Sequence, residues 1–168
     1  TGAVSASSIP PLAGVFGGGG LFGIGFAMGV LEGLKPRGID LSEVPLLGTS
    51  AGSWAAAATA FEVPFQVMAD MRVPSFPNPK PGLLAGIARE IFGDQRDPLI
   101  QVMACSLPRL QRTMLDGGQY PLSELVAASS AVPALLSPHS VNGTRYVDGG
   151  VRSGTSVDYG PDAENLVI

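Results

Sequence analysis

Short apolar runs and longer helical patterns alternate in the first third of the chain. Residues 13–16 and 44–47 are apolar runs too short for a helix, so we expect two buried strands. A helical pattern over 23–34 and an alanine-rich stretch over 51–61 predict two helices. The order strand, glycine turn, helix, strand, tight turn, helix is typical of the start of a parallel α/β sheet.

The pattern beyond residue 61 is less regular. Four prolines in residues 74–81 predict an irregular loop, and residues 98–105 and 107–115 fit neither a helix nor a strand clearly, so no central strand is evident here. The remaining expected elements are helices over 64–72, 83–92 and 121–131, and short strands over 145–147 and 165–168.

Composition narrows the function classes. A chain of 168 residues that is 45% apolar and 14% charged predicts one domain over residues 1–168 with a sizeable core. A net charge of −4 argues against nucleic acid as the main partner, since binding phosphates needs a basic surface. Cys105 is the one cysteine and His139 the one histidine. The sequence therefore excludes an internal disulfide and a Cys/His zinc site, and we expect no metal.

Residues 12–31 carry no charge and are long enough to span a bilayer. Four consecutive glycines, Gly17 to Gly20, lie inside this stretch, and glycine disfavours helix by about 1 kcal/mol per residue. A broken helix would leave backbone groups unsatisfied in lipid. We therefore do not expect a transmembrane helix here.

Gly48-Thr49-Ser50-Ala51-Gly52 matches the pattern G-x-S-x-G of a nucleophile elbow. This motif needs a sharp turn from a strand into a helix, which the predicted strand before it and the predicted helix after it would supply. The two glycines, Gly48 and Gly52, would let the backbone fold closely around Ser50. Ser50 could equally be an ordinary N-cap of the following helix, and the pattern alone leaves both interpretations open.

The glycine loop, Gly17 to Gly23, lies between a predicted strand and a predicted helix. Its backbone amides could form a nest for an anion, either a dinucleotide pyrophosphate or the oxyanion of an acyl-transfer intermediate. The dinucleotide interpretation needs a second strand that ends in an acid, and Asp40 does not follow a predicted strand. The sequence therefore favours an oxyanion hole formed by the amides of Gly18, Gly19 and Gly20.

A serine nucleophile needs a base. His139 precedes Asp148, which is the wrong order for an α/β-hydrolase triad, so we interpret His139 as a surface or loop-packing residue. Asp148, in Asp148-Gly149-Gly150, would stand at the end of a short strand, although Asp-Gly is also a common tight turn. Chemistry alone leaves other acids as candidates, namely Asp94, Asp97 and Asp116.

Taken together, these motifs resemble those of the patatin-like phospholipases. The glycine loop, the elbow Gly48–Gly52 and the late Asp148-Gly149-Gly150 occur in the order of that family, and the segment 128–133 (ASSAVP) is similar to the family's segment before the aspartate strand. The resemblance implies a three-layer α/β/α sandwich with a mostly parallel central sheet. It also implies a Ser50–Asp148 dyad that hydrolyses lipid esters without a cofactor, in the cytoplasm or at a membrane periphery.

The chain departs from the family pattern at several positions. Phe22 stands where the family carries Arg or Lys, so a cation that would hold a phosphate is missing, and Gly17 replaces an acid. The chain begins at Thr1 and stops at Ile168, where the family continues, so we expect a domain that could be incomplete at either end. Oligomeric state is left open.

The substrate is the least determined feature. Five large residues could line an acyl groove or belong to an ordinary core, and an acidic protein would contact a membrane through apolar rather than basic groups. The alternatives to a lipid hydrolase are a short-chain carboxylesterase, an inactive lipid-binding protein and a dinucleotide-binding module. The candidate groove residues are Leu21, Phe22, Trp54, Phe61 and Phe65.

Overall fold

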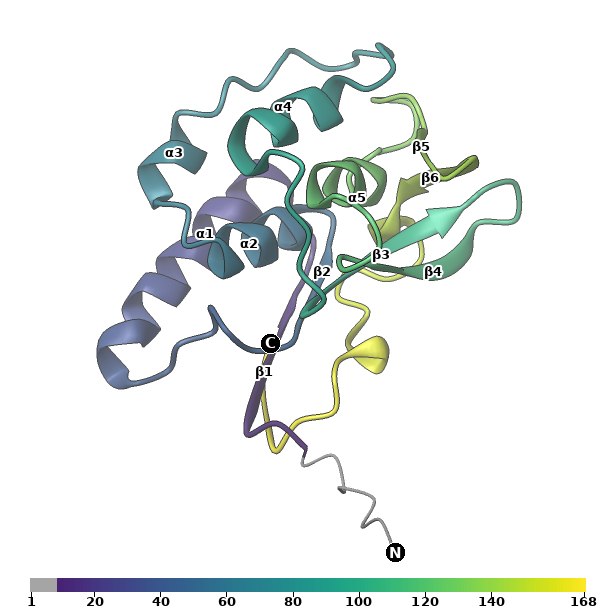
Figure 1. Cartoon of the computed structure of the whole chain (residues 1–168). Helices are drawn as coiled ribbons and strands as arrows, with labels where there is room; N and C mark the ends of the chain where they lie inside the picture. Colours follow the sequence, from purple (N-terminus) through teal and green to yellow (C-terminus); the bar gives the residue numbers. More distant parts are fainter. Residues whose placement is uncertain (1–8) are drawn as a thin grey trace, which may run out of the picture.

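Seven strands form one sheet in the computed structural model, which describes residues 9–168, and helices pack against that sheet (Figure 1). The expected α/β class with a central sheet is confirmed. That residues 1–168 make up one domain stays a prediction. The strands are β1 (Leu12–Phe16), β2 (Leu46–Thr49), β3 (Ile100–Ser106), β4 (Gln111–Asp116), β5 (His139–Val141), β6 (Thr144–Asp148) and β7 (Asn165–Val167). The helices are α1 (Gly20–Leu34), α2 (Ala51–Ala60), α3 (Phe65–Ala69), α4 (Leu83–Phe92) and α5 (Leu122–Ser129), with short 3-10 turns at Lys35–Arg37, Gly149–Val151 and Val157–Tyr159.

The sheet has a parallel half and an antiparallel half. Strands β7, β1, β2 and β3 are parallel neighbours, as the alternation of strands and helices predicts. Strand β3 is antiparallel to both β4 and β6, and β5 is antiparallel to β6. The sheet therefore changes direction at β3.

One edge of β3 is shared by two strands that meet end to end. Strand β4 pairs with β3 from Gln101 to Ser106 and so occupies one whole edge. On the other edge, β2 ends where Thr49 pairs with Met103, and β6 ends where Asp148 pairs with Ala104. Because β2 and β6 run in opposite directions, their carboxyl ends face each other at two consecutive residues of β3.

The five α-helices lie together on one side of the sheet (Figure 1). Helix α2 packs on β1, β2 and β3, and α5 packs beside it on β3, β5 and β6. The alanine-rich composition of α2 explains its central place, since small side chains allow a helix to lie close to a sheet. Its Ala55 to Ala58 are at most 1% exposed.

The opposite side of the sheet carries a smaller cluster formed by Val15, Leu47 and Met103. The segment 149–160 reaches this side, where Gly160 lies against Val15, and it contains two short 3-10 turns. The two outer layers of the expected sandwich are therefore unequal in the part of the chain that is described. Gly154 and Gly160 in this segment, and Pro161 directly after it, disfavour a regular helix.

Several element boundaries differ from the sequence prediction. Helix α1 begins at Gly20, three residues earlier than expected, and β2 begins at Leu46, two residues later. The ambiguous residues 98–115 contain the hairpin of β3 and β4. The uncharged stretch 12–31 is divided between β1, a glycine turn and α1, and none of the helices in residues 9–168 is long and apolar enough to cross a membrane.

Candidate active site

The elbow lies between β2 and α2, with Ser50 at its tip. Ser50 has φ 52° and ψ −121°, a conformation that non-glycine residues rarely adopt. Both elbow glycines are required by close packing: a Cβ on Gly48 would lie 2.7 Å from the Gly52 carbonyl oxygen, and one on Gly52 would lie 2.7 Å from the Gly17 carbonyl oxygen and closer still to that of Phe16. The turn is therefore as sharp as the sequence motif predicts.

The strand ends that meet on β3 bring the Ser50 and Asp148 side chains together. The Ser50 hydroxyl donates a hydrogen bond of 2.6 Å to Oδ2 of Asp148, and the Gly150 amide donates one of 2.6 Å to Oδ1. Ser50 stands at the N-cap position of α2, but its side chain makes no capping hydrogen bond there and instead faces Asp148. Asp148 does cap the turn Gly149–Val151, so its Asp-Gly-Gly sequence serves a turn and the contact to Ser50 at once.

Asp148 is only 5% exposed, and this burial is the dominant influence on its charge. Burial raises the pKa of the Asp148 carboxyl, while the hydrogen bonds from Ser50 and Gly150 lower it by a smaller amount, so the net direction is upward. Within residues 9–168 no cation pairs with Asp148. A carboxylate in such surroundings accepts a proton more readily than one in water.

The glycine loop approaches Ser50 from β1. A Cβ on Gly18 would lie 3.7 Å from Cβ of Ser50. The Gly18 amide, however, donates a 2.7 Å hydrogen bond to the carbonyl of Gly154, so it does not point freely toward an anion. Among the described residues, the amides of Gly19 and Gly20 have no such backbone partner, and they lie where α1 begins. The amino end of a helix favours negative charge.

Two serines that were not predicted as site residues belong to the surroundings of Ser50: Ser129 hydrogen-bonds to its amide, and Ser130 lines a cavity beside it. The amide of Ser50 donates a 2.8 Å hydrogen bond to the hydroxyl of Ser129, which in turn donates a 2.6 Å hydrogen bond to the Met103 carbonyl. The indole nitrogen of Trp54 donates a 3.0 Å hydrogen bond to the Ser130 hydroxyl. The family-like segment 128–133 was the signal in the sequence that could have pointed to both.

A cavity of about 350 Å³ opens beside Ser50. Its wall is almost entirely apolar, and it lies between α1, α2, α4 and the loops around residues 71–76 and 130–136. Of the five candidate groove residues, Leu21 and Trp54 line this cavity, Phe65 lines a neighbouring hollow, and Phe22 is 82% exposed. Phe61 packs against the core beside Phe92.

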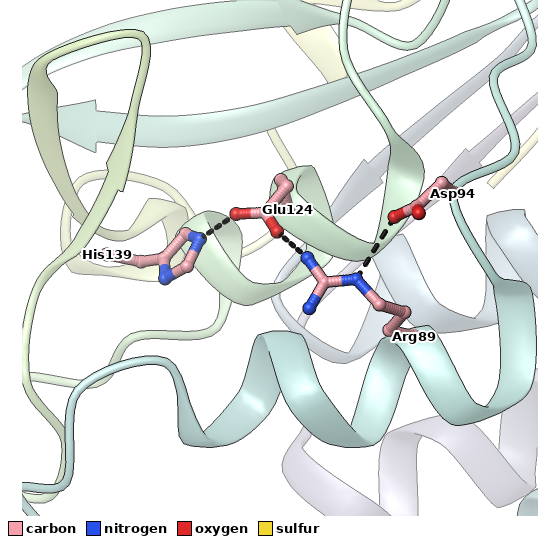
Figure 2. A network of polar contacts seen from close by, with 4 residues as sticks. All are labelled: Arg89, Asp94, Glu124 and His139. Atoms are coloured by element: carbon pink, nitrogen blue, oxygen red, sulfur yellow. Dashed lines mark hydrogen bonds and ion pairs between the residues drawn. The ribbon is translucent and has the colours of Figure 1, made fainter.

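The remaining acidic candidates and His139 belong to other parts of the molecule. His139 lies 2.6 Å from a Glu124 oxygen, Glu124 also contacts Arg89, and Arg89 pairs with Asp94 at 3.0 Å (Figure 2). This network joins α4, α5 and β5. Asp97 and Asp116 accept hydrogen bonds from the amides of Leu99 and Gly118, so both cap local turns. None of these acids contacts Ser50.

Comparison with known proteins finds one family model. Residues 106–160, about a third of the chain, match the family model described as patatin-like phospholipase. The resemblance to the patatin-like phospholipases is confirmed. The matched residues include Asp148 and Ser129 but not Ser50.

The fold is also similar to that of a solved structure, VipD from Legionella pneumophila, with a TM-score of 0.60 and 14% sequence identity. The similarity covers 96% of this chain and 49% of the VipD chain, so this chain spans about half the length of that protein. No curated protein matches the sequence.

Proposed function

We propose that this chain is a serine acyl hydrolase that cleaves carboxylic esters of lipids, with Ser50 as the nucleophile and Asp148 as the base. The observation that carries the proposal is the 2.6 Å hydrogen bond from the Ser50 hydroxyl to the buried Asp148 carboxylate, at the wall of an apolar cavity. A nucleophile within hydrogen-bond reach of its base is the arrangement that covalent catalysis requires.

The reaction begins when Asp148 takes the hydroxyl proton of Ser50 and the Ser50 oxygen attacks the ester carbonyl. The carbonyl oxygen becomes an oxyanion, for which the amides of Gly19 and Gly20 are the donors we propose. Asp148 then gives its proton to the leaving alcohol, and an acyl-enzyme remains. Water attacks this ester and passes a proton to Asp148, which returns it to Ser50 as the fatty acid leaves. Positioned proton transfer typically contributes about 10²–10⁴-fold in rate.

Gly18 has a different role in this proposal from the one that the sequence predicts. Its amide is engaged with the Gly154 carbonyl, and this bond ties the glycine loop to the segment after Asp148. We propose that Gly18 shapes the hole while Gly19 and Gly20 donate to the oxyanion.

The apolar cavity favours an acyl chain over a small polar substrate. Its lining residues, among them Leu84 and Ile87 of α4, offer no charged group to a ligand. We therefore prefer a lipid ester to the short-chain alternative. The basic residue that would hold a phosphate is replaced by the exposed Phe22, so the proposal includes no headgroup preference.

The outer face of α1 is the membrane contact that we propose. Leu21, Phe22, Phe26 and Val30 are 43–82% exposed, and the rings of Phe22 and Phe26 stack with centroids 6.2 Å apart. Leu21 lines the cavity as well, so this face is continuous with the cavity mouth. Because the face carries no charge before Glu32, it suits an uncharged lipid surface.

Labelling with a fluorophosphonate followed by peptide mass spectrometry tests the chemistry. We expect one adduct, on Ser50, and none in Ser50→Ala. An adduct elsewhere, or none under conditions where the protein is folded, would contradict the proposed nucleophile. Hydrolysis of p-nitrophenyl esters of increasing chain length then separates the lipid hydrolase from the short-chain esterase, which would prefer acetate or butyrate.

Sedimentation with phosphatidylcholine vesicles tests the membrane contact. We expect Phe22→Ser and Phe26→Ser to weaken binding, whereas Met114→Ser, which alters an exposed apolar residue on β4, should leave it unchanged. Vesicle binding by a protein inert toward every ester would instead support the inactive lipid-binding alternative.

A further inference from the structure

Strand β3 changes its partner between Met103 and Ala104, where β2 and β6 meet. Pairing with β2 stops at Met103, and pairing with β6 begins at Ala104. The carbonyl of Met103 accepts a hydrogen bond of 2.6 Å from the hydroxyl of Ser129, the last residue of α5. A buried carbonyl without a partner is costly, so a hydrogen-bond donor is needed here.

The same hydroxyl also binds the backbone of Ser50. Ser129 is fully buried, and its oxygen accepts the 2.8 Å hydrogen bond from the Ser50 amide. Because its proton is directed to Met103, a lone pair remains for the Ser50 amide. Ser50 thus has its amide fixed by Ser129 and its carbonyl fixed by Ser53, through the amide at 2.9 Å and the hydroxyl at 2.6 Å.

These contacts matter because the Ser50 backbone is strained. A non-glycine residue at φ 52° and ψ −121° persists only where its surroundings determine it. Without the Ser129 hydroxyl, the Ser50 peptide would be free to relax toward a more common conformation. The Ser50 oxygen would then move relative to Asp148, whose amide has a hydrogen bond of its own, of 3.0 Å, to the Ala131 carbonyl, and which pairs with Ala104 in the sheet.

We propose that Ser129 is a positioning residue for the reaction, which fixes the Ser50 amide to β3 so that the Ser50 oxygen stays in register with Asp148. The inference rests on the proposed function for its effect on rate. Ser129 then links the Ser50 amide to Met103, and Met103 directly precedes Ala104, the residue of β3 that pairs with Asp148.

The experiment compares variants of Ser129 with a matched control on the same helix. Ser123 is also fully buried on α5, and its hydroxyl has no hydrogen-bond partner within residues 9–168, so Ser123→Ala removes an equal group without removing a contact. We call the link from the Ser50 amide through the Ser129 hydroxyl to the Met103 carbonyl the Ser129 bridge. Ser129→Ala removes both of its hydrogen bonds. Ser129→Thr keeps the hydroxyl, and Ser129→Cys offers a weaker donor and acceptor of similar size.

We expect Ser129→Ala to lower kcat for p-nitrophenyl ester hydrolysis by about 10²-fold, the effect of a small misplacement of reacting groups. KM should stay within about twofold, because Ser129 does not line the cavity. Ser129→Thr should recover most of the rate, and Ser123→Ala should match the unaltered chain. If Ser129→Ala does not fold, Ser129→Cys takes its place in the experiment, and we expect it to lower kcat by about tenfold.

Hydrogen exchange of the Ser50 amide separates this inference from the proposed function. We expect slow exchange in the unaltered chain and in Ser123→Ala, and exchange at least about tenfold faster in Ser129→Ala. If no ester is hydrolysed but this exchange pattern is seen, the proposed function is rejected, while the role of Ser129 in fixing the Ser50 amide stands. Unchanged kcat in folded Ser129→Ala, a loss confined to KM, or unchanged exchange would overturn the inference.

Discussion

Two buried or half-buried carboxylates in this molecule differ in what surrounds them. Asp148 is 5% exposed, its donors are the Ser50 hydroxyl and the Gly150 amide, and no cation pairs with it in residues 9–168. The Glu124 side chain is 24% exposed and lies between Arg89 and His139 (Figure 2). The Asp148 carboxylate faces a neutral hydroxyl beside a cavity, and the Glu124 carboxylate faces basic groups that join three elements.

The difference teaches that neighbours, rather than residue type, determine the role of an acid. The chain's one histidine is the residue most often expected as a base, yet it lies in the Glu124 network, away from Ser50. Glu124 is matched by the opposite charge of Arg89, which ties α4 to α5. In the part of the chain that the structure describes, Asp148 has no such counter-charge, and its burial favours the protonated form, so it retains the ability to take up a proton.

The largest difference that we expect between the two carboxylates is in the rate of ester hydrolysis. Asp148→Asn should lower kcat/KM for ester hydrolysis by about 10²–10⁴-fold, because it removes the proton acceptor and keeps the shape. Glu124→Gln should change kcat/KM by less than about threefold, because Glu124 does not contact the cavity or Ser50. Equal losses in the two variants would mean that the network also serves the reaction.

The second test is the pH dependence of the rate. Asp148 acts as the carboxylate, so kcat/KM should fall as pH drops through its pKa, by about tenfold per pH unit below it. Burial raises that pKa above its ordinary value of 3.8, so the midpoint of the acid limb should lie above pH 3.8. Glu124→Gln should leave the midpoint in place, and a midpoint at or below pH 3.8 would contradict the assignment of Asp148.

The smallest expected effects concern stability, and they have opposite signs. The raised pKa of Asp148 means that the folded chain binds this proton more tightly than the unfolded chain does. The contribution of Asp148 to stability therefore falls as pH rises from 3.8 through the raised pKa and stays low above it. Asp148→Asn should therefore raise the melting temperature at pH 7. The difference from the unaltered chain should disappear near pH 3.

Glu124→Gln should instead lower the free energy of unfolding by up to about 1 kcal/mol, the range of partly exposed ion pairs. For a chain of this length that corresponds to a few degrees in melting temperature. Thermal unfolding of both variants at pH 7 measures the contrast. A stabilised Glu124→Gln chain would show that the network does not hold α4, α5 and β5 together.

Local motifs made the elbow and the Asp148 loop predictable. Gly48 and Gly52 are required by contacts within a few residues or with the adjacent strand, and such requirements leave a pattern in the sequence. The meeting of Ser50 with Asp148, 98 positions away, was implied by resemblance alone. No periodicity encodes a contact between two distant strand ends.

The features that escaped prediction depend on tertiary structure. Strand β3 is buried on both faces over most of its length, so it lacks the alternation that identifies a half-buried strand. The Ser129 bridge involves a serine that looks like any helix-terminal residue until β3 is beside it. The engaged Gly18 amide likewise depends on Gly154, which lies 136 residues away along the chain.

The end-to-end meeting of β2 and β6 has a consequence for how such chains can vary in length. The distance between Ser50 and Asp148 depends on two consecutive residues of β3, Met103 and Ala104, and not on the length of chain that links them. Insertions in the proline-rich loop before α4 would leave that spacing intact. A single residue added within β6 would turn Asp148 to the other face of the sheet, so the smallest insertion in the wrong place would cost more than a long one elsewhere.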